Sequence, residues 1–600
     1  MSLIDKHFWL ILVLLAVVGI FLELGRMDVC TDNEGQRATP PAEMVRSGNW
    51  VVPTINNVPY LAKPPLLYWA IAVVYTVTGN VSALTARIPS ALCAVALVLS
   101  VYLVLRKRLG EYAARWASIG LLGSPYFLEH ARWAQLDVPL ALATFMAITA
   151  TWTAFDTTSL TKKTYLTFLG GLALGAAILL KGPAPLAVFG SAWAAYLITK
   201  KEVSKRHIKT LGVVVFTSLL IEYVLRLSGL LTFPVALLAT AVYVVVWAWI
   251  TAPAERGRVT LVTLGVVILG VLLATPWALA VLNAVGWDNI RNLLHSEVVT
   301  RTHSASDINS GTPFYYLIAL PVLVAPWGFL FPFHFSRSQW RENSSAYRFC
   351  VVTAWMSILV FSLIAGKEYE YILPAFPLLL GATGVNLARI TRGDSVQCLQ
   401  HYIAIWTRIS LPLLGFLALG MLVYAVITNP HPLLLVETAL LASIVIGTGC
   451  WALLRGTGYR PHSIALQAIL LILIGLLVTR SYHYTGRNSP KEIAETTGSL
   501  LRNGYAVEAG WVRHPFTPAF AFYAATPIAM QMNFDIVQQR FSQSTPYYYL
   551  VQKEDMDKGR IPLKSYHVLM GPYGRKEYLL LGNAPLPGNF SPGRRQARDK

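Results

Sequence analysis

The sequence is dominated by runs of about twenty apolar residues that follow one another with few interruptions. A helix of that length crosses the hydrocarbon core of a bilayer. Of the 600 residues, 55% are hydrophobic and only 13% are charged, whereas a soluble protein carries about 25% charged residues. The runs do not alternate in polarity as barrel strands do, and helices satisfy their own backbone groups in lipid. The sequence therefore predicts an all-α polytopic membrane protein.

We predict about 13–15 transmembrane helices from these runs. The predicted spans are residues 8–25, 83–105, 112–128, 136–155, 164–180, 183–199, 209–226, 230–251, 260–283, 314–334, 347–365, 371–389, 404–427, 433–454 and 462–479. The first span lacks a small-residue cleavage site, so we expect a retained signal anchor.

The formal net charge of +19 does not indicate a nucleic-acid partner. The basic residues cluster in short loops on one side of the predicted spans, as the positive-inside rule expects of cytoplasmic loops. With the N-terminus inside, an odd number of spans places the segment from about residue 480 outside. We expect membrane lipids as partners and no nucleic acid.

The composition changes after residue 480. Residues 489–504 predict a helix, with Ser489 as its cap and Gly504 at its end. Four short strands are predicted at residues 505–512, 547–554, 565–571 and 576–583. We therefore predict a transmembrane domain over residues 1–480 and a small soluble α/β domain over residues 481–600. Five scattered cysteines, without a close pair, predict no disulfide framework.

The first outer loop, residues 27–82, is rich in polar residues and prolines. We expect two helices along the membrane surface, one over "PAEMVRSG" and one after Pro64 and Pro65. Asp32 and Glu34 directly follow the first span. We interpret Glu43 and Arg46 as solvated loop charges.

Other charged residues fall at the outer ends of separate spans. Lys, Arg and Tyr can act there as interfacial anchors, although ionisable residues in spans are usually functional. Several of these segments contain both carboxylates and cations. This predicts a site on the outer side in which a carboxylate acts as a base and the cations bind an anion. These residues are Arg132, Asp137, Lys181, His295, Glu297, Arg301, His303, Asp307, Lys367, Glu368 and Glu370.

Several segments resemble a known superfamily. They include "DNEGQRATPPAEMVRSGNWVVPTINNVPYLAKPPLLYW", "RIPSAL", "ARWAQLDVPLAL", "LLKGPAPL", "PFYYLIALPVLVAPW" and "GKEYEYILPAFPLLL". These are similar to blocks of the aminoarabinose transferase and dolichyl-phosphate-mannose–protein mannosyltransferase superfamily. The resemblance implies a GT-C fold in the bacterial inner membrane. It also implies an enzyme that moves a sugar from a polyprenyl-phosphate donor to a lipid or protein acceptor at the periplasmic face.

The resemblance also implies roles for individual residues. An acidic residue of the first outer loop would be the catalytic base, and Lys63 of the Lys-Pro-Pro corner would bind the donor phosphate. Asn33 stands where the family has Asp, so the base remains open between Glu34 and Asp32. Ala62 replaces the usual Glu, which weakens both a metal site and the aminoarabinose assignment.

We therefore expect no cofactor and no metal, although His295, Glu297 and His303 are residue types that suit zinc. The predicted catalytic residues are Glu34, Asp32 and Asp137. The predicted donor-phosphate ligands are Lys63, Lys181, Arg132 and Lys367. Further site candidates are Arg37, Arg87, His295, Glu297, Arg301 and Tyr369.

The rival interpretation is a secondary transporter or flippase for a lipid-linked or anionic substrate. Such a protein would place charges and broken helices near the middle of the membrane. Most predicted spans are free of charge in their interior, with Glu222 as the main exception. A non-catalytic scaffold for the C-terminal domain is a third interpretation, and the polar outer turns argue against it.

Overall fold

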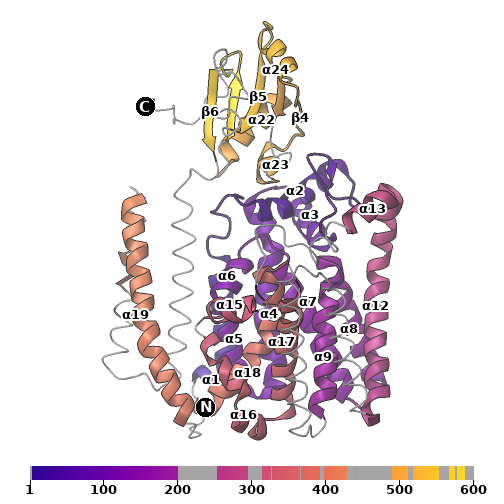
Figure 1. The fold of residues 1–600 in the computed structure, drawn as a ribbon, viewed down its shortest axis with the longest axis vertical. Helices are drawn as coiled ribbons and strands as arrows, with labels where there is room; N and C mark the ends of the chain where they lie inside the picture. The colour runs from indigo at the N-terminus through magenta and orange to yellow at the C-terminus, as the bar shows by residue number, and fades with distance from the viewer. Residues whose placement is uncertain are drawn as a thin grey trace, which may run out of the picture. The chain divides into compact units, whose positions relative to one another are not determined.

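The structure is a computed structural model, and Figure 1 shows its fold. It describes residues 3–200, 253–294, 312, 314–325, 327–364, 366–391, 397–428, 439–440, 442–443, 447, 489–510, 518–552, 567–573 and 578–587. Six of the described helices are long and apolar enough to cross a membrane. The candidate spans are Ala83–Leu109, Asp137–Asp156, Leu160–Lys181, Gly257–Val285, Ser345–Leu363 and Tyr369–Ile390. The all-α membrane class predicted from the apolar runs is confirmed.

The chain divides into two compact units. Unit 1 is Met1–Leu22, Ala62–Leu66 and Ser90–Val478, and unit 2 is Glu23–Leu61, Leu67–Pro89 and Thr479–Lys600. The second unit resumes close to the predicted domain boundary at residue 480. Most of the first outer loop, which we placed in the membrane domain, groups with the C-terminal domain instead.

Unit 1 is built from helices. These are α1 (Leu3–Phe21), α4 (Ala83–Leu109, in unit 1 from Ser90), α5 (Glu111–Leu122), α6 (Pro125–Ala131), α7 (Asp137–Asp156), α8 (Leu160–Lys181), α9 (Ala184–Lys200), α12 (Pro253–Val285), α13 (Trp287–Leu294), α15 (Tyr315–Leu323), η2 (Trp327–Phe335), α16 (Arg337–Glu342), α17 (Ser345–Leu363), η3 (Tyr369–Ala375), α18 (Phe376–Thr391) and α19 (Gln397–Thr428). Helices α7, α8 and α12 run side by side (Figure 1).

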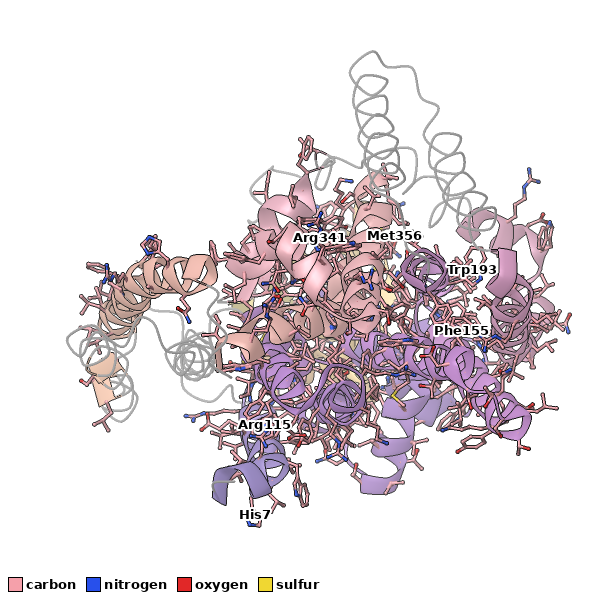
Figure 2. The ribbon with its side chains drawn as sticks, turned by 90° about the horizontal axis from the view of Figure 1, so that it is seen from below. His7, Arg115, Phe155, Trp193, Arg341 and Met356 are labelled. Carbon is pink, nitrogen blue, oxygen red and sulfur yellow. The ribbon has the colours of Figure 1, made fainter. Side chains whose placement is uncertain are left out.

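Small residues allow these helices to approach closely, as is common within membranes. A Cβ atom at Gly384 of α18 would lie 2.2 Å from the Ala113 carbonyl oxygen of α5. Helix α16 and the N-terminus of α1 lie at the same end of unit 1 (Figure 1). Figure 2 views unit 1 from this side and labels Arg341 of α16 and His7 of α1. His7 belongs to the N-terminal segment that we predicted to lie inside, and Arg341 belongs to the basic loop between the predicted spans 314–334 and 347–365.

Three predicted spans are not single α-helices. The predicted span 112–128 is two helices, because α5 ends at Leu122 and Ser124 caps α6 by accepting the Phe127 N–H. The span 314–334 is divided into α15 and η2. The span 371–389 begins as the 3-10 helix η3. Spans 209–226, 230–251 and 462–479 lie outside the described residues, as does most of 433–454.

Unit 2 combines an α/β domain with the first outer loop. Its elements are α2 (Asp32–Ser47), β1 (Thr54–Ile55), β2 (Val58–Pro59), α3 (Leu66–Thr78, in unit 2 from Leu67), α22 (Lys491–Arg502), β3 (Ala506–Gly510), α23 (Pro518–Ala524), β4 (Ala529–Met530), α24 (Phe534–Phe541), β5 (Tyr547–Gln552), β6 (His567–Tyr573) and β7 (Tyr578–Gly582). The sheet order is β4-β3-β5-β7-β6. Strands β4, β3 and β5 are parallel, and β7 is antiparallel to its two neighbours.

The α/β domain agrees with the sequence prediction. All four predicted strands are present, as β3, β5, β6 and β7. The Ser489 side chain accepts the Lys491 N–H at the start of α22, and Gly504 has a φ of 81° at its end. Its core also contains Ile55 of the first outer loop, packed with residues such as Phe520 and Leu550.

The first outer loop contains a longer helix than we predicted. Helix α2 begins at Asp32 rather than near Pro41, because the Thr31 side chain accepts the Glu34 N–H at 3.2 Å. It ends before Gly48, as predicted, with Gly48 at a φ of 71°. Asp32 and Glu34 therefore lie in the first turn of a helix.

The interpretation of Glu43 as a solvated loop charge is wrong. Its side chain is buried and accepts the backbone N–H groups of Asn56 and Asn57 at 2.6 and 3.2 Å. These two residues form the turn between β1 and β2 with positive φ angles of 56° and 61°. Arg46 donates to the Ala525 carbonyl of the C-terminal domain. Glu43 therefore fixes the β1–β2 turn, and Arg46 links α2 to the C-terminal domain.

Candidate active site

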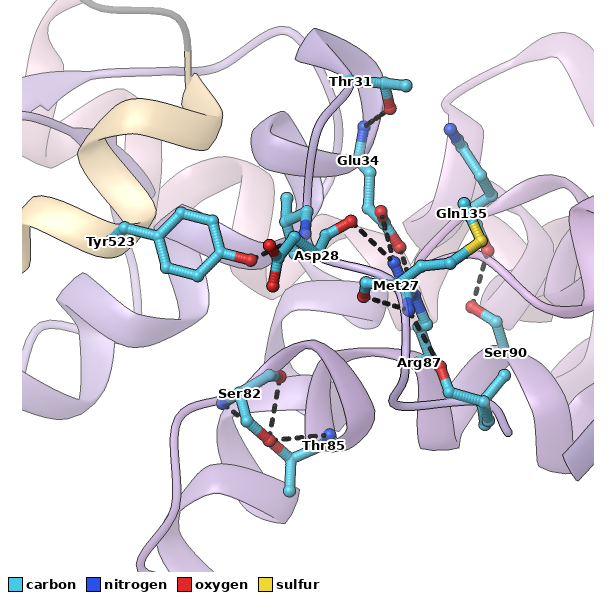
Figure 3. Close-up of polar contacts among 12 residues, drawn as sticks. Met27, Asp28, Thr31, Glu34, Ser82, Thr85, Arg87, Ser90, Gln135 and Tyr523 are labelled. Carbon is cyan, nitrogen blue, oxygen red and sulfur yellow. Dashed lines mark hydrogen bonds and ion pairs between the residues drawn. The ribbon is translucent and has the colours of Figure 1, made fainter. Parts of the chain in front are cut away.

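A buried ion pair lies at the start of α2. Arg87 Nε donates to Glu34 Oε1 at 2.7 Å, and a second guanidinium nitrogen donates to Glu34 Oε2 at 2.9 Å. Both side chains are only 2–3% exposed. Figure 3 marks the contacts between Glu34 and Arg87 with dashed lines. This bidentate arrangement is the strongest geometry available to an arginine and a carboxylate.

Arg87 also organises the segment that leads into α2. Its Nη1 donates to the carbonyl oxygens of Leu24 and Met27, both at 2.8 Å. Its Nη2 donates to the Asp28 carbonyl at 3.3 Å (Figure 3). One guanidinium therefore binds three backbone carbonyl groups and the Glu34 carboxylate, which accounts for its tolerance of burial.

The two candidate bases are placed differently. Both oxygens of Glu34 accept hydrogen bonds from Arg87, so a substrate proton would compete there with a fixed cation. Asp32 is the first residue of α2, where the helix dipole favours a negative charge. The side chain of Asp32 lies outside the described part of the structure. Arg37 is buried further along the same helix.

A second buried ion pair lies in unit 1. Lys181 Nζ, at the end of α8, is 2.5 Å from Asp137 Oδ1 at the start of α7. Their side chains are 10% and 4% exposed. The ammonium group also lies 4.7 Å from the centre of the Tyr371 ring. The predicted base Asp137 and the predicted phosphate ligand Lys181 are therefore brought together, and each neutralises the other.

Arg132 and Lys367 bind backbone carbonyl groups at helix ends. Arg132 donates to the carbonyl oxygens of Gly19, Ile20 and Leu22 at 2.8–3.0 Å, at the C-terminus of α1. Lys367 is fully buried and donates to the Ser362 and Ile364 carbonyl oxygens at 2.6 and 2.5 Å, at the C-terminus of α17. Both cations satisfy carbonyls that a helix end leaves without a partner.

Tyr369 belongs to an aromatic cluster. It stacks on Tyr315 with ring centres 4.8 Å apart and meets the edge of Tyr126 at 6.3 Å. Tyr369 is 39% exposed, so part of its ring remains accessible. Lys63 is half-buried and precedes Pro64, Pro65 and the start of α3. His295, Glu297 and Arg301 lie outside the described residues.

Within the ranges that the structure describes, no group of three His, Cys, Asp or Glu residues could hold a metal ion. Three described cysteines, Cys30, Cys93 and Cys350, are free thiols. Cys30 follows Asp28 on the way into α2. Burial, followed by the Asp28 and Glu34 carboxylates, raises the pKa of Cys30 to about 12. The thiol is therefore protonated at neutral pH.

Sequence reasoning missed two features of this region. Thr31 and Glu34 have the Thr-x-x-Glu spacing of a capping box, which is a recognised helix start. That signal would have placed the start of α2 correctly. Tyr523 of α23 contacts the segment before α2 by accepting the Val29 N–H at 2.7 Å. No local pattern predicts this contact, because 494 residues separate the two partners.

The chain is similar to glycosyltransferases. Residues 62–225 match the dolichyl-phosphate-mannose-protein mannosyltransferase family. The undecaprenyl phosphate-alpha-4-amino-4-deoxy-L-arabinose arabinosyl transferase of Shewanella sediminis is 24% identical over 63% of this chain and 59% of its own length. A transferase of the same name from Pseudomonas fluorescens Pf0-1 is 28% identical over 57% of this chain and 52% of its own length. The matches span less than two thirds of these two relatives.

Comparison with a solved structure shows a similar fold over almost the whole chain. ArnT from Cupriavidus metallidurans in the apo state has a TM-score of 0.69 to this chain at 19% identity, covering 96% of this chain and 98% of ArnT. The chain is therefore similar in sequence and in fold to members of the aminoarabinose transferase and protein mannosyltransferase superfamily. The predicted GT-C fold, with its C-terminal α/β domain, is confirmed.

Proposed function

We propose that this protein is an inverting glycosyltransferase. It moves a sugar from a polyprenyl-phosphate donor to a lipid or protein acceptor. The relatives are named as transferases that act with undecaprenyl phosphate, and ArnT has been crystallised with undecaprenyl phosphate. The main structural support for the proposal is the buried Glu34–Arg87 ion pair. This pair holds the first turn of α2, which contains the candidate bases Asp32 and Glu34, in one position.

We assign the base to Asp32 and a positioning role to Glu34. The Asp32 carboxylate takes the proton of the acceptor nucleophile as its oxygen or nitrogen attacks the anomeric carbon. The bond between that carbon and the donor phosphate oxygen breaks in the same step, so the configuration inverts. Glu34 remains bound to Arg87 and keeps the start of α2 in one place.

Lys63 is our primary candidate for the donor phosphate. The prolines that follow it restrict the backbone on entry to α3. An ammonium held at a fixed point stabilises the charge that grows on the leaving phosphate in a low-dielectric site. Lys181 is a second candidate, where a bound phosphate would share the ammonium with Asp137.

The site is proposed to lie at the periplasmic face of the bacterial inner membrane. The distribution of basic loops supports this orientation. A periplasmic reporter fused after Asn57 or Gly504 should be active, and the same reporter fused after Gly110 should be inactive. The opposite pattern would contradict the outer-face site.

The transfer reaction can be tested directly in proteoliposomes. The purified protein is mixed with a radiolabelled sugar on undecaprenyl phosphate and with candidate acceptors, namely lipid A and peptides. We expect Asp32→Asn to abolish transfer and Glu34→Gln to reduce it through loss of loop order. Glu43→Gln is the matched control on the same helix, because Glu43 holds the β1–β2 turn and does not contact Arg87.

The outcomes separate the possible functions. Movement of intact lipid-linked sugar across the bilayer without transfer would identify a flippase and overturn the proposal. Full activity of Asp32→Asn with loss in Glu34→Gln would reverse the assignment of the base. No transfer by the wild-type protein to lipid or peptide acceptors would contradict the proposed reaction.

A further inference from the structure

The C-terminal domain packs directly on the helix that carries Asp32 and Glu34. A Cβ atom at Gly35 of α2 would lie 2.2 Å from the backbone nitrogen of Ala519 in α23. Thr39 of α2 donates its hydroxyl hydrogen bond to the Pro518 carbonyl at 2.7 Å. All these residues belong to unit 2. The contact is backbone to backbone, so α2 cannot shift along α23 without losing it.

One peptide group between α1 and α2 is held from both sides. Its carbonyl, that of Asp28, accepts a hydrogen bond from Arg87 at 3.3 Å. Its N–H, that of Val29, donates to the Tyr523 hydroxyl at 2.7 Å. Figure 3 shows Tyr523 on one side of this peptide and Arg87 on the other. Tyr523 therefore acts on the same backbone that positions the Arg87 guanidinium.

The surroundings of Tyr523 keep its hydroxyl in place. Its ring packs against the core of the α/β domain and lies edge-on to Phe522, with ring centres 5.0 Å apart. Lys491 lies 5.7 Å above the ring and 3.6 Å from the Asp28 carboxylate. Burial, with a further contribution from Asp28, raises the pKa of Tyr523 above its usual value. The phenol therefore stays neutral.

We propose that Tyr523 is a positioning residue for sugar transfer. It fixes the Asp28–Val29 peptide, this peptide helps to orient Arg87, and Arg87 holds Glu34 at the start of α2. The proposal rests on the glycosyltransferase function and gives the C-terminal domain a part in it. Displacing a catalytic group by about 1 Å can cost roughly a hundredfold in rate, even when the cause lies outside the reacting atoms.

The test compares two Tyr→Phe substitutions in the full-length protein. Tyr523→Phe removes the hydroxyl that accepts the Val29 N–H and keeps the ring. Tyr548→Phe is the control, because Tyr548 is buried in the same core and its hydroxyl donates to Pro585 at 3.2 Å. Both variants lose one phenolic hydrogen bond, and only Tyr523→Phe loses one to the first outer loop.

Two measurements are made on each variant in the same lipid. The first is steady-state transfer with varied donor. We expect kcat of Tyr523→Phe to fall by roughly tenfold with donor KM unchanged within about twofold, because the loop is displaced and the phosphate ligands are not. The second is amide hydrogen exchange of the segment Leu24–Glu34. We expect faster exchange in Tyr523→Phe and wild-type exchange in Tyr548→Phe.

Specific results would overturn the inference. Wild-type kcat in Tyr523→Phe would do so, as would an equal loss of kcat in both variants, which would indicate general destabilisation of the domain. Unchanged exchange over Leu24–Glu34 would refute the contact, whether or not the protein transfers sugar. No transfer by the wild-type protein would instead count against the proposed function, which keeps the two failures distinct.

Discussion

Arg87→Gln should increase local opening of the first turn of α2. The increase should be far larger than the one caused by removing an exposed salt bridge. The substitution leaves the Glu34 carboxylate buried without its cation, and the side chain of Glu34 is only 3% exposed. Removing one partner of a buried pair costs about 3–5 kcal/mol. Arg87 also holds three backbone carbonyl groups, so the loss is expected toward the upper end. At about 1.4 kcal/mol per factor of ten, local opening should increase by roughly two to three and a half powers of ten.

The assay is amide hydrogen exchange over the first turns of α2 in detergent, since local opening controls exchange there. Arg26→Gln provides the matched control. Arg26 forms an ion pair with Glu23 at the same N–O distance of 2.7 Å, but these side chains are 35% and 24% exposed. An exposed pair contributes about 0–1 kcal/mol, so exchange should increase by less than about fivefold.

A double substitution provides the sharpest check. Arg87→Gln combined with Glu34→Gln removes the uncompensated charge, so α2 should exchange more slowly in the double variant than in Arg87→Gln alone. Equal exchange in Arg87→Gln and Arg26→Gln would refute the reasoning. So would a double variant whose effect is the simple sum of the two single ones, because the two groups would then be uncoupled.

Further predictions concern the cations, metal dependence and Cys30. Lys63→Ala should weaken donor use by roughly one to two powers of ten, with partial recovery in Lys63→Arg, in assays of donor kinetics. Arg132→Met should speed exchange at the C-terminal end of α1, and unchanged exchange there would contradict its capping role. Thorough chelation should leave transfer intact, and activity lost with stoichiometric zinc would contradict this expectation. Cys30 should react with iodoacetamide about a thousandfold more slowly at pH 8 than a thiol of pKa 9, with the rate still rising at pH 10.

The membrane fold was predictable because length and apolar composition alone specify a spanning helix. Breaks within spans were not predictable to the same degree. The apolar run 112–128 is continuous in composition, yet Gly123 and Ser124 divide it into two helices. Ser124 caps α6 and also donates to the Leu323 carbonyl, which is a tertiary contact. Hydropathy reports only whether a segment prefers water or lipid. It therefore cannot predict a helix break that depends on a capping interaction.

The strands of the C-terminal domain were predictable from short apolar runs between turn residues. Its association with the first outer loop was not. Ile55 enters the domain core, and Asn56 exchanges hydrogen bonds with the backbone of Ile528. Each of these contacts joins residues more than 400 positions apart, so no local period or motif encodes them. The loop and the domain form one compact unit, in which each supplies apolar surface and hydrogen-bond partners to the other.

The candidate cations are of two kinds, arginines and lysines. This chemical difference helps to decide which of them would bind the donor phosphate. Arg87 and Arg132 use their planar guanidinium groups to bind sets of backbone carbonyl groups. A guanidinium suits such sets because its five donors are rigidly arranged. The donor phosphate stays on its polyprenyl lipid and gains negative charge when the sugar leaves, so it requires a cation that can share its charge with it. A lysine ammonium is a compact charge on a flexible stem, and Lys181 already shares its charge with a carboxylate at 2.5 Å. We therefore expect each arginine to have a structural role in its own unit, and we propose the lysines at residues 63 and 181 as the better candidates for the donor phosphate.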